Sequence, residues 1–346
     1  MQNTPSPLSS LPGHYRAMAL VEAGRALHGL ELPMRPLEPN EIRLRVHTCG
    51  VCRTDLHIVD GELATPALPR VPGHEIVGTV VERGPACRLH RIGQRVGVPW
   101  LADTCGRCAM CSAGRENLCA EATFTGWTVD GGYAEYAVAH EAYCFDLPSD
   151  YDDVSAAPLL CAGLIGYRAL RMAPEARAVG LYGFGAAAHL VAQVALAQGR
   201  RVYAFTRPGD EAAQSLALSL GVHWAGDSTQ DPPGPMDAAL IFAPAGELVP
   251  RALQVLEPAG TVVCAGIHMS DIPSFAYRWL WQERCVRSVA NLTRQDGIDF
   301  FDLAGRHRLH LATTVYELAD ANHALEDLRG GRVAGAAVLR CGPPST

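Results

Sequence analysis

The sequence predicts an α/β protein that combines a doubly wound parallel sheet with a separate β-rich domain. Residues 15–150 hold many short apolar runs divided by Gly and Pro, a pattern typical of an irregular, partly closed β domain. From about Arg177 onward, strand and helix patterns alternate, which indicates βαβ units and a parallel sheet. A chain of 346 residues, 48% of them hydrophobic, is long enough for about two such domains.

The β-rich part follows a short lead. Its first twelve residues are rich in Ser and Pro and lack the basic and apolar regions of a secretion signal, so we expect residues 1–14 to be disordered. Alternating apolar and polar residues at 41–46 predict a strand, and similar β-type runs recur along this part. The predicted strands cover residues 16–21, 41–46, 76–81, 95–98 and 133–138.

The rest of the chain carries the alternating pattern and then a tail. Residues 153–172 are expected to be helical, with Asp152 or Asp153 as the N-cap and Pro158 interrupting the first turns. The tail, from Thr313, resembles the first part and is expected to fold back onto it. Further strands are predicted at 178–182, 201–205, 237–242, 261–265, 336–340 and, as a sheet edge, 285–289; helices are predicted at 186–198, 211–220, 247–256 and 321–329, the last N-capped by Asp320. The predicted domains are 15–155 with 292–346 (β-rich) and 156–291 (parallel sheet).

Composition excludes several classes of protein. The net charge of −7 argues against nucleic acid as a partner, because phosphate binding needs a basic face. No apolar run approaches the roughly 20 residues that span a bilayer, so no membrane association is expected. Twelve cysteines without a secretion signal favour reduced or metal-bound thiols and a cytoplasmic location.

Four cysteines lie close together between residues 105 and 119. Cys105, Cys108, Cys111 and Cys119 follow the spacing C-x2-C-x2-C-x7-C, which suits a tetrahedral zinc ion with four thiolate ligands. Such a closed site has no open position, so it would brace a loop and take no part in chemistry. Two disulfides or four buried thiols are the alternatives.

A second set of metal-ligand residues is spread along the chain. Cys52 follows a predicted strand, His74 lies in Gly-His-Glu, and Cys161 comes much later. Two sulfurs and one imidazole would leave the fourth position of a zinc ion open for a reactant. Taken singly, His74 is more commonly a hydrogen-bonded structural histidine and Cys161 a buried thiol.

A glycine loop stands where a strand gives way to a helix. Gly183-Phe-Gly185-Ala186-Ala187-Ala188 is a G-x-G-x-x-A variant of the dinucleotide-binding loop. Gly183 permits the tight turn, and Gly185 lets the backbone approach a pyrophosphate at the helix N-terminus.

These motifs together resemble the zinc-dependent medium-chain alcohol dehydrogenases over nearly the whole chain. The resemblance rests on residues 50–57 and 73–75, the four cysteines, Cys161 and the glycine loop. It implies a GroES-like catalytic domain, a Rossmann nucleotide domain and two zinc ions per chain. By the same resemblance Cys52, His74 and Cys161 hold the catalytic zinc, with Glu75 behind the metal and Asp55 orienting a ligand, and Cys105, Cys108, Cys111 and Cys119 hold the structural zinc.

The resemblance also assigns a proton path and a pocket. Thr54 is two residues from Cys52, close enough to touch a zinc-bound oxygen, and the family passes the proton through the cofactor ribose to the position of His57. Trp100 and Trp127 stand where the family lines its substrate cleft. Homodimers or homotetramers are implied, with the 285–289 edge strand as a joining surface.

The cofactor is predicted from the end of the second strand of the parallel sheet. An NAD enzyme places Asp or Glu there for the ribose 2′-hydroxyl. This chain has Thr206 and Arg207, which suit a 2′-phosphate and predict NADP(H) preference. The alternative is a solvated arginine, with Asp210 supplying the acid.

The predicted function is reversible oxidation of an alcohol to an aldehyde or ketone, with zinc and NADP(H). Bulky Trp100 and Trp127 favour hydrophobic primary alcohols, including aromatic ones, and Trp281 is expected either in the pocket or in the core. The alternatives are a secondary-alcohol or polyol dehydrogenase of the same superfamily and, in another class, a non-catalytic cofactor-binding or redox-sensing protein. Cys49 is expected to be a neighbour of the metal site and not a ligand, and the cysteines expected to serve only packing are Cys87, Cys144, Cys264, Cys285 and Cys341.

Overall fold

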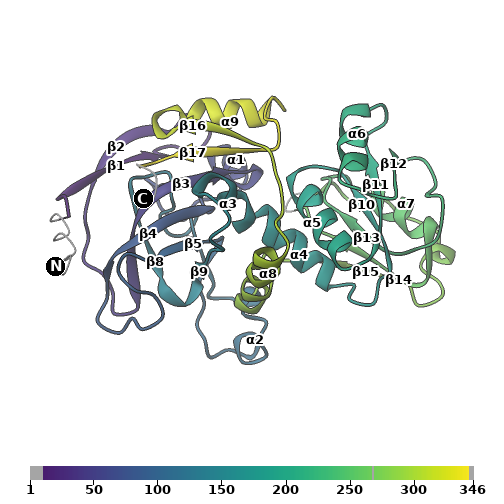
Figure 1. The fold of residues 1–346 in the computed structure, drawn as a ribbon, viewed down its shortest axis with the longest axis horizontal. Coiled ribbons are helices and arrows are strands. Elements are labelled where there is room, and N and C mark those ends of the chain that lie inside the picture. Colours follow the sequence, from purple (N-terminus) through teal and green to yellow (C-terminus); the bar gives the residue numbers. More distant parts are fainter. Residues whose placement is uncertain (1–10, 267–268, 343–346) are drawn as a thin grey trace, which may run out of the picture.

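A computed structural model describes residues 11–266 and 269–342 of the chain. Figure 1 shows two lobes, with helices α4 (Ala162–Arg171) and α8 (Arg294–Arg306) lying between them. The first ten residues of the predicted disordered lead lie outside the described part. None of the helices in the described part has both the length and the apolarity needed to cross a bilayer.

One lobe is built on a six-stranded parallel sheet with the strand order β12-β11-β10-β13-β14-β15. The order reverses between β10 and β13, which makes the sheet doubly wound and confirms the predicted fold class. Its strands are β10 (Ala178–Tyr182), β11 (Arg201–Thr206), β12 (Trp224–Asp227), β13 (Met236–Ile241), β14 (Leu256–Cys264) and β15 (Cys285–Ser288), and its helices are α5 (Ala186–Ala197), α6 (Glu211–Ser219), α7 (Leu248–Val255) and the short η4 (Tyr277–Trp279).

The other lobe is built on a seven-stranded sheet with the order β16-β17-β3-β4-β5-β9, and β8 also pairs with β3. Smaller sheets pair β1 with β2 and β6 with β7. The strands are β1 (His14–Ala19), β2 (His28–Pro33), β3 (Glu41–Val51), β4 (Ile76–Arg83), β5 (Arg95–Val98), β6 (Leu101–Asp103), β7 (Thr123–Phe124), β8 (Tyr136–His140), β9 (Phe145–Asp146), β16 (Thr313–Glu317) and β17 (Ala336–Arg340). The helices are α1 (Arg53–Val59), α2 (Ala109–Ser112), α3 (Asp153–Ala156), α9 (Ala321–Arg329) and the short η1 (Glu116–Leu118), η2 (Glu141–Tyr143), η3 (Ala157–Leu160) and η5 (Leu318–Asp320).

The C-terminal tail completes the seven-stranded sheet, as predicted. β17 pairs antiparallel with β3, and Leu339 lies opposite Cys49. The last strand of the described residues therefore lies beside the strand that leads into Cys52.

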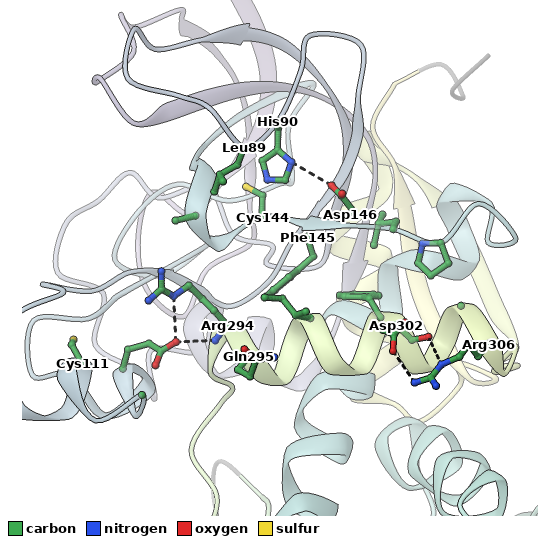
Figure 2. Close-up of a pocket in the computed structure, with 18 residues that line it drawn as sticks. Leu89, His90, Cys111, Cys144, Phe145, Asp146, Arg294, Gln295, Asp302 and Arg306 are labelled. Atoms are coloured by element: carbon green, nitrogen blue, oxygen red, sulfur yellow. Dashed lines mark hydrogen bonds and ion pairs between the residues drawn. The ribbon is translucent and has the colours of Figure 1, made fainter.

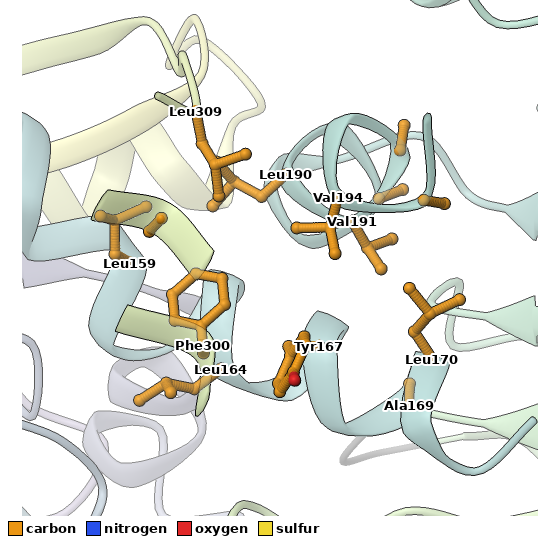
Figure 3. Packing of buried hydrophobic residues seen from close by; sticks show 14 of the residues in the cluster. Leu159, Leu164, Tyr167, Ala169, Leu170, Leu190, Val191, Val194, Phe300 and Leu309 are labelled. Atoms are coloured by element: carbon orange, nitrogen blue, oxygen red, sulfur yellow. The ribbon is translucent and has the colours of Figure 1, made fainter. Parts of the chain in front are cut away.

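Apolar side chains make up much of the contact between the lobes. Figure 3 shows Tyr167 and Leu170 of α4 across from Val191 and Val194 of α5, with Leu190 beside Leu309 and Leu164 beside Phe300 of α8. Helix α5 is apolar on nearly every side because it packs against both the parallel sheet and α4. One continuous core thus joins the two sheets.

Some expectations were wrong. The predicted helix 153–172 is broken into α3, η3 and α4, with Cys161 at the last junction. Trp281 is 59% exposed, so it does not pack in the core, and Cys285 is exposed on the edge strand. The strand β12 and the helices α1 and α8 were not predicted. Helix α1 escapes prediction because its N-cap is a cysteine, in place of the usual Ser, Thr, Asp or Asn.

Candidate active site

Cys52, His74, Glu75 and Cys161 converge at one point, and we call them the Cys52 cluster. Each offers one ligand atom, and these four atoms all lie within 4.8 Å of one another. Cys52 Sγ lies 3.2 Å from His74 Nε2 and 3.9 Å from Cys161 Sγ. Ligands of tetrahedral zinc stand about 3.5–3.8 Å apart, so this donor set fits the ion.

Three different parts of the fold position the residues of the cluster. Cys52 directly follows β3 and caps α1, where its Sγ accepts a hydrogen bond from the Thr54 N–H at 3.4 Å. His74 and Glu75 directly precede β4, and Gly50 N–H donates to the Glu75 carbonyl at 3.0 Å. Cys161 stands at the break between η3 and α4, which turns its thiol toward the other two elements.

Asp55 lies behind the cluster and is fully buried. Its carboxylate accepts the Cys52 N–H at 2.9 Å and the Gly73 N–H at 3.3 Å. His74 Nδ1 stands 3.3 Å from the same carboxylate, as an ion-pair contact without hydrogen-bond geometry. This arrangement turns Nε2 of His74 toward the sulfurs, as a metal ligand requires.

The pKa of Cys52 is lowered well below its usual value. The main cause is a hydrogen bond from Cys161; burial opposes the shift and the charge of His74 adds to it. The thiolate is the form of cysteine that binds metals, so the environment already favours it.

Glu75 occupies a space that only glycine leaves open. A Cβ on Gly50 would lie 1.9 Å from Glu75 Oε2. Burial raises the pKa of Glu75 well above its usual value, and the negative charge of Cys52 adds to this rise. Gly50, which the sequence showed only as part of a motif, therefore makes room for a carboxyl group beside the cluster.

Thr54 and His57 lie one turn apart on α1. Residues three apart share a face of a helix, so both side chains lie on the same side of α1. Thr54 is 9% exposed, and the side chain of His57 is 19% exposed. His57 Nδ1 makes a short contact with Glu62 Oε2, a partner that sequence reasoning missed.

Three aromatic rings form a wall beside His74. Trp100 packs edge-on against His74, with 4.9 Å between ring centroids, and stacks on Trp127 at 5.9 Å. Phe124 stacks on both tryptophans, at 5.3 and 5.4 Å. The structure thus brings the two predicted pocket residues together and adds Phe124, which its sequence context did not mark.

The four cysteines of residues 105–119 form a compact group, here called the four-cysteine lobe. Cys105 Sγ lies 3.5 Å from Cys119 Sγ and 4.0 Å from Cys111 Sγ, and the Cys108–Cys111 separation is 3.5 Å. A disulfide would need about 2.05 Å. A zinc tetrahedron with arms of about 2.3 Å has edges of about 3.8 Å, so the lobe fits zinc and not two disulfides.

The glycine loop lies at the point where the strand order of the parallel sheet reverses. Gly183 has φ +85°, and a Cβ there would come within 2.8 Å of the Ala243 backbone nitrogen after β13. Gly185 is the N-cap of α5 and has open space around it. Ala186 and Ala187 form the first turn of α5, so their backbone is positioned as the loop motif requires.

The end of β11 holds Thr206 and Arg207. Thr206 is buried, and its hydroxyl accepts from Gln214 Nε2 at 3.0 Å, whereas Arg207 is exposed and has no ion pair within the described residues. Asp210, the alternative acid, caps α6 through the Ala213 N–H. Sequence reasoning missed Asp227, which the parallel register of β12 places opposite Thr206 and whose carboxylate accepts from Gly209 N–H and Gln214.

A groove of about 1040 Å³ lies away from the Cys52 cluster, between α8 and the β9 region. In Figure 2 the charged residues that line it are paired with one another: Arg294 with Glu116, Arg306 with Asp302 and His90 with Asp146. Its lining shares Cys111 with the four-cysteine lobe and includes none of the Cys52 cluster. We therefore assign it no part in the reaction.

Comparisons with known proteins support a single class. Residues 38–149 match the family model described as "Alcohol dehydrogenase GroES-like domain". "Probable alcohol dehydrogenase AdhA" of Mycobacterium tuberculosis (strain CDC 1551 / Oshkosh) is 48% identical over 309 residues, 87% of this chain and 89% of the relative. An "Alcohol dehydrogenase" of Geobacillus stearothermophilus is 33% identical over 336 residues, 94% of this chain and 98% of the relative.

A solved structure agrees with these relatives. The cinnamyl alcohol dehydrogenase SbCAD4 of Sorghum bicolor superposes with a TM-score of 0.86 at 26% identity, covering 94% of this chain and 97% of that one. The chain belongs to the medium-chain alcohol dehydrogenase family, which confirms the resemblance seen in its motifs. Its activity is oxidoreduction of an alcohol.

Proposed function

We propose that this protein is a zinc-dependent alcohol dehydrogenase that moves a hydride reversibly between a primary alcohol and NADP(H). The observation that carries the proposal is the Cys52 cluster, two sulfurs, one imidazole and one carboxylate within 4.8 Å of one another. Three of these, Cys52, His74 and Cys161, would leave one coordination position for the reactant. Glu75 stands behind them as an alternate ligand.

The chain's own residues supply orientation and proton transfer. Zinc, when bound, acts as a Lewis acid that makes the alcohol easier to deprotonate. Asp55 keeps His74 and the Cys52 backbone in place. Thr54 receives the hydroxyl proton, and His57, on the same face of α1, takes it toward solvent.

The four-cysteine lobe would hold a second zinc ion, which has a structural role. Four thiolates fill all positions of a tetrahedral ion, so the site braces residues 105–119. The neighbouring Glu116 and Asn117 are buried and bind α8 and the segment before it, through Arg294 N–H at 2.9 Å and the Ala290 carbonyl at 2.7 Å.

The preference for NADP(H) rests on Arg207. Its guanidinium is exposed at the end of β11 and is not neutralised by a carboxylate within the described residues, so it suits a 2′-phosphate. The pyrophosphate would lie at Gly183, Gly185, Ala186 and Ala187, at the N-terminus of α5. Asp227 opposes this preference, because its negative charge also lies near the end of β11, where the 2′-phosphate would bind.

The substrate is proposed to be a hydrophobic, including aromatic, primary alcohol. The wall of Trp100, Phe124 and Trp127 offers stacked apolar faces next to His74. The name of the similar Sorghum bicolor enzyme, a cinnamyl alcohol dehydrogenase, agrees with such a substrate. Trp100→Ala should reduce the preference for benzyl alcohol over ethanol, and unchanged selectivity would count against the wall.

The deciding experiment measures metal and activity together. The purified protein is assayed for NADPH consumption with benzaldehyde before and after chelation, then after zinc is restored. The proposal expects activity to disappear with the metal and to return with zinc. Activity that persists without metal would refute it, and a parallel screen of primary, secondary and polyol substrates with both cofactors tests the substrate and cofactor assignments.

We also propose a homodimer or homotetramer in the cytoplasm. Strand β15 ends the six-stranded sheet in the described part of the chain, so its outer edge offers unpaired backbone groups to a second copy. The cysteines are free thiols, which suits a reducing compartment. Light scattering of the purified protein gives the oligomeric state, and a monomer at micromolar concentration would contradict the assembly.

A further inference from the structure

A carboxylate outside the Cys52 cluster contacts the ring of His57. Glu62 Oε2 lies against His57 Nδ1 in a short hydrogen bond. The turn after α1 produces this contact, because Gly61 adopts φ +80° and the Leu63 N–H donates back to the His57 carbonyl at 3.0 Å. The left-handed glycine thus folds Glu62 back over the last turn of the helix.

The contact fixes where the ring holds its proton. An ionised carboxylate accepts hydrogen bonds and has none to donate, so Nδ1 of His57 must be the protonated nitrogen. The neutral ring then has Nε2 as its basic nitrogen. The Glu62 side chain is 53% exposed and that of His57 19%, so the pair extends from the helix face shared with Thr54 to solvent.

We propose that Glu62 is the positioning residue for the proton transfer that His57 performs, an inference that rests on the relay role proposed above for His57. A proton released by the alcohol forms a new bond at Nε2 of His57. The ring becomes a cation, and Glu62 stabilises that cation while it keeps the ring in place. The cation then loses one proton to water, which restores the neutral ring with its proton on Nδ1.

A purely structural ion pair is the competing explanation. Exposed ion pairs contribute little to folding, typically about 0–1 kcal/mol. Removal of such a pair would leave every catalytic step unchanged. The two explanations therefore predict different rates of hydride transfer when Glu62 is replaced, because hydride transfer is coupled to loss of the hydroxyl proton.

The test compares single-turnover rates of NADPH formation from benzyl alcohol in Glu62→Ala, Glu62→Gln, His57→Gln and the double variant His57→Gln/Glu62→Ala. We expect Glu62→Ala to slow the single-turnover rate about 3- to 10-fold, with KM values changed less than about 2-fold. Glu62→Gln should recover part of the rate, because its amide oxygen still accepts from Nδ1. In the His57→Gln background, Glu62→Ala should cause no further loss.

Asp60→Asn is the matched control. It removes a negative charge two residues away, from the pair of Asp60 with Arg329, and should leave the rate unchanged. If His57→Gln is slow but Glu62→Ala equals wild type, the inference about Glu62 is overturned and the proposed function stands. If His57→Gln itself equals wild type, the relay role of His57 fails. An equal loss from Glu62→Ala in both backgrounds would also overturn the inference, because Glu62 would then act without His57.

Discussion

Gly166 of α4 lies against the backbone of Ala187 in the first turn of α5. A Cβ on Gly166 would stand 3.1 Å from the Ala187 carbonyl oxygen and 3.2 Å from Val191 Cβ. Helix α4 begins directly after Cys161, and α5 begins directly after Gly185. This close approach therefore helps to set the position of the Cys52 cluster relative to the glycine loop.

The first prediction follows from that contact. Gly166→Val should push α4 and α5 apart, cost about 1–3 kcal/mol of stability and reduce kcat/KM by more than tenfold, while the metal content stays unchanged. Denaturant unfolding, kinetics and metal analysis check the three parts. Gly305→Ala in α8 is the control, because a Cβ there meets Pro148 at an ordinary 3.7 Å. Full activity in Gly166→Val would show that the spacing of the helices is unimportant.

The second prediction concerns the zinc ion proposed for the Cys52 cluster. His74→Ala should lower the zinc content from about two to about one per chain and abolish measurable turnover, because a ligand is lost. Cys49→Ala should keep both ions, although Cys49 and Cys52 share a C-x2-C spacing, because Cys49 Sγ packs among Gly73 and Gly132. Metal analysis of both variants by mass spectrometry shows whether His74 or Cys49 belongs to the ligand set.

The third prediction tests whether the four-cysteine lobe stabilises the fold without taking part in the reaction. Glu116 is buried, and its carboxylate holds the backbone and side chain of Arg294 at 2.9 and 3.3 Å. Glu116→Gln should cost about 1–3 kcal/mol in thermal or denaturant unfolding, with kcat nearly unchanged. Glu121→Gln, which breaks the exposed pair between Arg107 of this lobe and Glu121 just after it, should have no such effect. Equal losses in both variants would argue against the bracing role.

The fourth prediction concerns the cofactor. Arg207→Ala should raise KM for NADP+ at least tenfold and leave KM for NAD+ nearly unchanged, because a guanidinium contact to a phosphate is lost. Asp227→Asn should have the opposite effect and lower KM for NADP+, since one negative charge near β11 is removed. Steady-state kinetics with both cofactors measures this. A preference for NAD+ in the wild type would mean that Asp227 outweighs Arg207.

The fifth prediction concerns stability at low pH. Burial alone would raise the pKa of Glu141, but the backbone N–H groups of Arg88 and Leu89 bind its carboxylate and lower the pKa overall. A lowered folded-state pKa gives stability that is present above the unfolded-state value of about 4.3 and is lost as pH falls further. Glu141→Gln should therefore unfold more easily at pH 7 and lose less of its remaining stability at pH 4. The exposed Glu257→Gln should follow the wild-type pH dependence.

Sequence patterns predict some features of this fold and site and miss others. The fold class could be named in advance from periodicity, and the folding back of the tail from its likeness to the first part of the chain. The residues of the Cys52 cluster could be named only because their motifs together resemble a known family. The roles assigned to the site residues and the domain boundaries stay predictions. Three further residues could not be found this way, because the three-dimensional fold brings them to their partners. Phe124 is placed by ring stacking, Asp227 by the parallel register of β12, and Glu62 by a left-handed turn. Exposed Cys285 and Trp281 show that a hydrophobic residue type alone does not predict burial.

The pairing of β17 with β3 has a consequence for biosynthesis. Residues 336–340 are synthesised long after Cys52, yet they lie beside β3, the strand that directly precedes Cys52. Until β17 has been made, Cys52 sits at the margin of an unfinished sheet, and its final surroundings form only after residues 336–340 have left the ribosome. Under the zinc proposal, loading of an ion at the Cys52 cluster is thus expected to follow synthesis of β17, whereas residues 105–119 could capture an ion earlier, on the nascent chain.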